Sequence, residues 1–445
     1  MRNRGSQARW ASASIALLLC GCGDDQGTAT VPIAVVESPP ELAEPVRTGS
    51  RSIPFTELLI RSTANTPKSI VSDLFYLRDV QPIPGRAGEM SAIELSHCTA
   101  DAICIHVETL GQDSYEVARL GDRKNIMRWV AAGSAVVGGK PEVRVVGVTV
   151  GRSSASPLPK TTFTVQSMLL AKGSPIETTR LLPEFEAMVG QAILAVGDCD
   201  ADGQEDFLLV MLKGVECQLL SGNGLQTLAT IPTRSLGIVA SKIGDVDGDG
   251  SDDVFVSEEN GSDFTIISPK ARKVILQLTL DAALGNKVFI RDACGSGHSA
   301  KGEPSLAVDY LSADESEIEK IAVVSALTGV QLEPPMELVS HLSGLDSGRI
   351  SGSHRRWLAW STAENRAAGV VQLFIREVSV ADSTVEVLLP ADARRYAAAL
   401  CAVAASGSTH DCLAITVSPA DQVYGIPITF DPIMFLDVAR CLEKR

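Results

Sequence analysis

Short apolar runs, each the length of a β-strand, recur along this 445-residue chain and are separated by polar turns. The clearest runs belong to a repeat of 47 residues, in which 189–198 align with 236–245. The alignment continues without a gap until Leu219-Leu220-Ser221 falls on Ile266-Ile267-Ser268. Each repeat contains four such runs joined by turns of hairpin length. The pattern therefore predicts four antiparallel strands per repeat.

One four-stranded sheet cannot bury both of its faces alone, so such repeats must pack against one another. A fixed period of this size, built from short strands, is typical of β-propeller blades. Weaker versions of the pattern occur before and after the two clear repeats. We therefore predict an all-β chain, a β-propeller of about seven four-stranded blades with six to eight allowed, over residues 69–445. The clearest blades are expected at 189–235 and 236–282, whereas the alanine-rich run 392–405 fits a strand or a short helix.

The turn after the first strand of each clear repeat is strongly acidic and reads D-x-D-x-D-G-x-x-D. Carboxylates at positions 1, 3, 5 and 9, with a backbone carbonyl at position 7, form a cage of hard oxygen ligands that suits Ca²⁺. Glycine at position 6 allows a sharp turn. The alternative is a solvated turn without metal. The predicted ligands are Asp198, Asp200, Asp202, Gln204 and Asp206 in the first loop, and Asp245, Asp247, Asp249, Ser251 and Asp253 in the second.

An EF-hand would place a glutamate at position 12 and helices on both sides, but position 12 is Leu209 or Val256, within a predicted strand. Calcium-type loops in strand-rich repeats resemble FG-GAP (also VCBS-type) repeats, the calcium-loop blades of integrin α-chain propellers and many bacterial surface proteins. The resemblance covers about 90 residues and implies two structural Ca²⁺ sites. The Phe-Gly and Gly-Ala-Pro motifs that name the repeat are absent from this stretch, and Asp292-Ala293-Cys294 in the next unit lacks the alternating carboxylates.

The N-terminus predicts export. Residues 1–21 combine three arginines with a short apolar stretch, as in a secretory signal. They lead into Leu19-Cys20-Gly21-Cys22, which resembles the bacterial lipobox and implies cleavage after Gly21 and acylation of Cys22. An ordinary signal peptide is the alternative. Residues 22–68 are rich in proline, serine and threonine and predict a lipid-anchored tether, of which 55–60 is apolar enough to pair with the folded body.

Eight further cysteines, an even number in an exported chain, favour disulfides. Their spacing suggests Cys98 with Cys104, Cys199 with Cys217, Cys401 with Cys412, and Cys294 with Cys441; buried free thiols are the alternative. The spacing matches no zinc-site pattern.

The net charge of −15 disfavours nucleic acid as a partner. The six histidines form no recognisable catalytic set, and we expect no enzyme activity. The cluster His354-Arg355-Arg356-Trp357 is interpreted as a loop beside a packed tryptophan, with an anion or sugar site as the alternative. The expected function is a calcium-stabilised lipoprotein of the cell envelope, held at the outer membrane by its lipid alone, that serves as a platform for a protein or glycan partner. The alternatives are an envelope-assembly scaffold propeller and a polysaccharide lyase.

Overall fold

The computed structural model describes the chain from Arg51 to Glu443 with gaps, and the expected signal segment, Cys22 and the tether up to residue 50 lie outside the described residues. The described ranges are 51–60, 69–70, 79–82, 91–99, 102–109, 115–120, 125–152, 160–170, 176–181, 185–186, 192–211, 216–233, 239–257, 261–284, 287–298, 302–312, 315–338, 341–350, 353, 355–363, 371–380, 383–389, 398–403, 412–417, 428–429 and 434–443.

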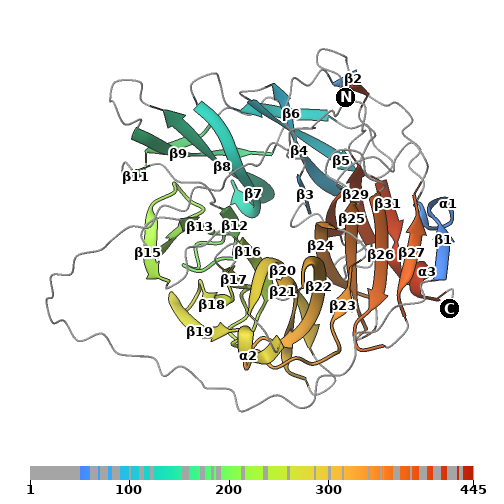
Figure 1. Cartoon of the computed structure of the whole chain (residues 1–445). Coiled ribbons are helices and arrows are strands. Elements are labelled where there is room, and N and C mark those ends of the chain that lie inside the picture. The colour runs from blue at the N-terminus through green and yellow to red at the C-terminus, as the bar shows by residue number, and fades with distance from the viewer. Residues whose placement is uncertain are drawn as a thin grey trace, which may run out of the picture. The chain divides into compact units, whose positions relative to one another are not determined.

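The chain forms an all-β propeller, in which meander sheets follow one another in chain order (Figure 1). The first three sheets are β3 (Asp79–Pro82), β4 (Ser91–Thr99), β5 (Ala102–Thr109) and β6 (Tyr115–Leu120); then β7 (Asn125–Val137), β8 (Lys140–Arg152), β9 (Lys160–Leu169) and β10 (Thr178–Leu181), with β11 (Phe185–Glu186) also on β9; then β12 (Ala192–Ala195), β13 (Phe207–Met211), β14 (Glu216–Leu220) and β15 (Thr227–Pro232).

Four further sheets complete the series. They are β16 (Val239–Gly244), β17 (Asp253–Ser257), β18 (Asp263–Ser268) and β19 (Lys273–Thr279); then β20 (Val288–His298), β21 (Pro304–Ser312), β22 (Glu315–Ser325) and β23 (Met336–Glu337); then β24 (His341–Arg349), β25 (Arg356–Ala363), β26 (Val371–Glu377) and β27 (Val385–Leu388); and finally β28 (Ala398–Val403), β29 (Cys412–Val417) and β31 (Met434–Asp437). In the described residues there are thus seven meander sheets, and β2 (Ser69–Ile70) pairs separately with β30 (Ile428–Thr429).

The two clear repeats each form one four-stranded sheet, β12–β15 and β16–β19, as the 47-residue period predicts. The described part of the alanine-rich run, 398–403, is β28, so this part is a strand where the sequence left a short helix open. The first strands of successive sheets lie beside one another, and β28 lies beside β3. The helices are short: α1 (Phe55–Leu58), α2 (Asp281–Leu284) and α3 (Val438–Glu443). No helix in the described ranges has the length and hydrophobicity needed to cross a membrane.

The cores lie between consecutive sheets, because successive side chains of a strand point to opposite faces. On β17, Val254 and Val256 pack against the preceding sheet, whereas Phe255 packs against the following one. Every residue of β17 is therefore buried. The strand reads as an apolar run because both of its faces are covered, and this packing is what holds the loop before β17 in place.

The segment 51–60 belongs to the folded body rather than to a tether. β1 (Arg51–Pro54) pairs in parallel with β27, and Leu59 forms a bridge to Leu436 of β31. Ile53, Phe55 and Leu58 are buried in the core between the last two sheets. The sequence suggested a closing strand at 55–60. The structure places the strand four residues earlier and makes 55–58 a helical turn, so this segment joins the sixth sheet to the seventh.

Candidate metal centres

The first acidic loop, 198–206, connects β12 to β13 and is fixed at its base by backbone hydrogen bonds. The N–H of Val196 donates to the carbonyl of Asp206 at 2.9 Å, and the N–H of Asp206 donates to the carbonyl of Gly197 at 2.8 Å. Gly203, at position 6, has φ of +85°, a conformation that a residue with Cβ adopts only with strain. The loop therefore turns where the sequence predicts.

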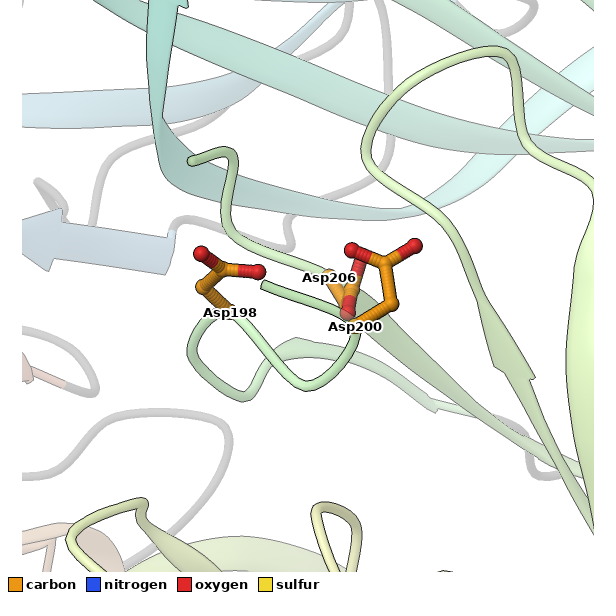
Figure 2. A group of neighbouring side chains, drawn as sticks. All are labelled: Asp198, Asp200 and Asp206. Carbon is orange, nitrogen blue, oxygen red and sulfur yellow. The ribbon is translucent and has the colours of Figure 1, made fainter. Parts of the chain in front are cut away.

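Three carboxylates converge in this loop. Asp198, Asp200 and Asp206 each offer an oxygen, and these oxygens lie within 4.8 Å of one another (Figure 2). Backbone N–H groups hold the side chains: Asp198 Oδ2 accepts from Gly203 at 2.9 Å, and Asp206 Oδ2 accepts from Cys199 at 2.9 Å. Such fixed acceptors place like charges together without a cation, at an electrostatic cost that a divalent ion would remove.

The second loop, 245–253, connects β16 to β17 and repeats this arrangement. Asp245, Asp247 and Asp253 bring three carboxylate oxygens within 4.8 Å of one another. Asp245 Oδ2 accepts from the N–H of Gly250 at 2.9 Å, and Asp253 Oδ2 accepts from the N–H of Val246 at 2.7 Å. Gly250 has φ of +86°, matching Gly203 of the first loop.

Position 5 lies outside both groups of three, although the sequence pattern included it. Asp202 accepts from the N–H of Gln204 at 2.9 Å. Asp249 accepts from the N–H of Ser251 at 2.9 Å and from the Ser268 hydroxyl at 3.0 Å. Positions 1, 3 and 9 are thus assembled in each loop, whereas ligation by position 5 and by the carbonyls of Gln204 and Ser251 stays a prediction.

Burial sets the electrostatics of the position-9 carboxylates. Asp206 and Asp253 are fully buried, and burial raises the pKa of each to about 6. Backbone N–H donors oppose this shift, and the neighbouring carboxylates of the same loop add to it. A buried, charged oxygen needs a partner.

In the second loop, one carboxylate oxygen indicates a cation as its partner. Asp253 Oδ1 is buried and has no hydrogen-bond donor among the described residues. Oxygen donors from several carboxylates on a turn suit a hard divalent cation such as Ca²⁺ or Mg²⁺. The residues present in 245–253 therefore fit a metal ion.

The first loop contacts the preceding sheet. In the first loop, Gln204 accepts at 3.2 Å from Arg144 of β8, which also pairs with Glu177 at 2.6 Å. The carboxylate of the adjacent Glu205 accepts from the N–H of Ser134 on β7 at 2.7 Å. Arg144 was not identified from the sequence, because an arginine inside an apolar strand shows no partner until the fold brings one.

The expected disulfides involving the described cysteines are wrong. Cys199, Cys294 and Cys441 are free thiols, so the Cys199–Cys217 and Cys294–Cys441 bridges are not formed. Cys412 is also a thiol, and the strand register sets it opposite Val403 rather than Cys401. Cys199 and Cys217 contact the same core without being bridged, whereas Cys294 and Cys441 lie in two different cores. The side chains of Cys98, Cys104 and Cys401 lie outside the described residues, as does Cys22.

The cluster His354-Arg355-Arg356-Trp357 is structural where it is described. Arg355 makes a two-point ion pair with Glu377, at 2.7 and 2.9 Å. Trp357 is fully buried in the core between the last two sheets. These contacts favour the packed-tryptophan interpretation over an anion or sugar site.

A third acidic group, outside the two loops, was not identified from the sequence. Asp292 on β20 lies directly opposite Asp309 on β21, and Asp309 Oδ1 is buried without a donor among the described residues. Burial, with smaller contributions from the charges of Glu319 and Asp292, raises the pKa of Asp309 well above its usual value. Asp309 stands inside the apolar run of β21, and this was the available signal. The oxygens of this group do not form a metal cluster among the described residues.

Comparison with known proteins shows the fold alone. No protein-family model matches the sequence, and no curated protein matches it. The chain is similar to BBS1N, crystallised in complex with ARL6DN and soaked with lead, at 10% identity and a TM-score of 0.50, over 87% of this chain and 97% of that one. A Kuenenia stuttgartiensis hydrazine synthase is similar over 58% of this chain and 70% of its own, at 13% identity and a TM-score of 0.38. The first likeness supports the β-propeller architecture that the sheets display.

Proposed function

We propose that this protein is a non-catalytic, calcium-stabilised propeller of the cell envelope that serves as a binding platform for a protein or glycan. The observation that carries the proposal is the convergence of three carboxylates in each acidic loop, with a buried oxygen of Asp253 that no described group satisfies. The FG-GAP/VCBS resemblance of the two blades agrees with Ca²⁺ as the ion. Attachment to the outer membrane through Cys22 rests on the lipobox resemblance.

Calcium in these loops has a structural role in this proposal. Each loop connects the first two strands of a blade, and the first loop also contacts the preceding sheet, so a bound ion would stabilise the blade and, at the first loop, its packing on the neighbouring sheet. Sites with dissociation constants of 10⁻⁴–10⁻³ M would each add about 1 kcal/mol at millimolar calcium. Two sites would raise the melting temperature by a few degrees.

Calorimetric melting of the purified protein with 2 mM CaCl₂, and then with excess chelator, tests the metal sites. We expect a calcium-dependent rise that the double variant Asp200→Ala, Asp247→Ala lacks. A variant in which Asp263, an exposed carboxylate away from both loops, becomes alanine should keep the full rise. Equal melting temperatures for the parent with calcium and with chelator would contradict the proposal.

The platform role is tested by binding without turnover. We expect the protein to deplete from solution onto an insoluble glycan or an envelope protein fraction and to produce no unsaturated uronates from acidic polysaccharides. New ultraviolet absorbance from such a substrate would instead establish a lyase.

A further inference from the structure

The two acidic loops share their sequence pattern but differ in how the position-9 carboxylate is satisfied. In the first loop both oxygens of Asp206 accept hydrogen bonds, Oδ2 from the N–H of Cys199 and Oδ1 from the N–H of Gly222, each at 2.9 Å. In the second loop Asp253 Oδ2 accepts from the N–H groups of Val246 and Asp247, at 2.7 and 3.2 Å. Its Oδ1 accepts from none of the described residues.

The cause is one residue in the turn after the third strand of each blade. The 47-residue repeat places Pro269 where the first repeat has Gly222. Proline has no N–H, so it has no hydrogen to donate to the carboxylate. Gly222 also approaches closely: a Cβ on it would stand 2.3 Å from the carbonyl oxygen of Glu205. The first loop therefore keeps a short backbone contact that the second loop cannot form.

An unpartnered, buried carboxylate oxygen is costly in the metal-free protein and is a good ligand for a cation. Asp206 has to share its Oδ1 between Gly222 and an ion, whereas Asp253 Oδ1 has no competing donor. The aspartate at position 5 is also more firmly held in the second loop than in the first. Asp249 is half-buried and accepts from the Ser268 hydroxyl, whereas Asp202 is exposed and accepts from the N–H of Gln204 in its own loop.

We propose that the two loops are inequivalent cation sites: 245–253 fills first, with Asp253 ligating through the oxygen left without a donor by Pro269, and 198–206 fills at higher concentration. This inference rests on the proposed function, because it requires that both loops bind a cation. It assigns to Pro269 a role in metal affinity, although proline supplies no ligand from its side chain.

Lys270 acts in the opposite direction. It replaces Asn223 of the first repeat, and its ammonium donates to the backbone carbonyl of Asp249 at 2.5 Å. Lys270 is exposed, so solvent and salt screen its charge, and its amine can leave when an ion enters. The buried oxygen of Asp253 is not screened in this way, and it decides the order of filling.

Isothermal titration of the purified protein with CaCl₂ tests the order. We expect two binding phases separated by about tenfold or more in dissociation constant. Asp247→Ala should remove the tighter phase and leave the weaker one, and Asp200→Ala should do the reverse. Removal of the tighter phase by Asp200→Ala would overturn the inference.

Pro269→Gly tests the cause, because it restores the residue type and the N–H found in the first loop. We expect it to weaken the tighter phase about tenfold and to leave the weaker phase unchanged. Pro232→Gly, at an exposed proline ending β15, is the matched control for added backbone freedom and should change neither phase. Pro269→Ala restores the N–H with a smaller gain in freedom, but its Cβ opposes the close approach that Gly222 makes, so we expect a smaller weakening of the tighter phase, and this variant gives the answer if the glycine variant does not fold.

The failure of this inference is distinguishable from that of the proposed function. A parent protein that binds no calcium, or whose binding neither aspartate variant changes, would overturn both. The two phases could instead be assigned to the loops as expected while both Pro269 variants fold and neither weakens the tighter phase. That result would overturn the role of Pro269 alone.

Discussion

The buried carboxyl group of Asp292 should make the stability of this protein depend on pH in a way that one substitution removes. Asp292 lies opposite Asp309, and the charge of Asp346 from the next sheet reaches it. Burial raises the pKa of Asp292 to about 7; the N–H of Ala293, which donates to Oδ1 at 2.8 Å, opposes the shift, and Asp346 adds to it. The folded protein therefore keeps a proton that the unfolded chain releases near pH 4.

The size of the effect follows from the two pKa values. A rise from 3.8 to about 7 corresponds to roughly 4 kcal/mol at 1.36 kcal/mol per unit. Asp292 keeps some exposed surface and is coupled to Asp309, so we expect about half of this value. Folding raises the pKa of Asp292. The contribution of Asp292 to the free energy of unfolding is therefore greatest below about pH 4, falls as the pH rises towards 7 and is then constant.

Asp292→Asn keeps the acceptor for the N–H of Ala293 and removes the charge. We expect the variant to be about 2 kcal/mol more stable than the parent at pH 8, and less than about 1 kcal/mol more stable at pH 4.5. Urea unfolding in chelator, followed by tryptophan fluorescence, measures both values, because Trp357 and Trp360 are buried. Glu216→Gln, at the half-buried start of β14, is the control. A variant no more stable than the parent at pH 8 would refute the reasoning.

Three further predictions concern packing and the thiols. Arg376→Met removes the ion pair at 2.8 Å and leaves Glu333 charged and largely buried. We expect the free energy of unfolding in urea to fall by about 3 kcal/mol, and the added substitution Glu333→Gln to recover most of this loss. No loss in the single variant would contradict the role of the ion pair. Ile53 is 2% exposed, so Ile53→Ala leaves a cavity in the core. We expect the free energy of unfolding to fall by about 2–4 kcal/mol, against about 1 kcal/mol for Ile53→Val. Equal stabilities of parent and variants would show that β1 does not pack as described. Burial raises the pKa of Cys441 to about 12, so a thiol reagent should modify Cys441 only after the protein unfolds. Mass spectrometry locates the modified cysteine, and rapid labelling of Cys441 in the native protein would contradict this prediction.

The sequence predicted those features that depend on neighbours along the chain. The strand-length runs of 189–282 became two four-stranded sheets, because alternating side chains and turn residues are local properties. The acidic loops were also foreseeable: the glycines at position 6 adopt positive φ, and positions 1, 3 and 9 converge. A nine-residue turn largely fixes its own geometry, so its pattern carries the information.

Contacts between distant segments were decided only by the tertiary structure. The parallel pairing of Arg51–Pro54 with β27 joins residues more than 300 positions apart, and no local pattern encodes that partner. The cysteines followed the same rule, since Cys294 and Cys441 lie in different cores and remained thiols. The sequence showed only that the unit of Asp292 lacks the alternating carboxylates of the two loops, and the fold placed Asp292 within a strand, opposite Asp309.

The difference between the two acidic loops combines both kinds of information. The sequence alone places Pro269 in the position of Gly222, but only the folded blade brings that turn onto the position-9 carboxylate of the preceding hairpin. Sequence thus determined which residues were available in each repeat. Tertiary structure decided which oxygens were left without a donor, because burial and hydrogen-bond partners are set by segments that meet only after folding.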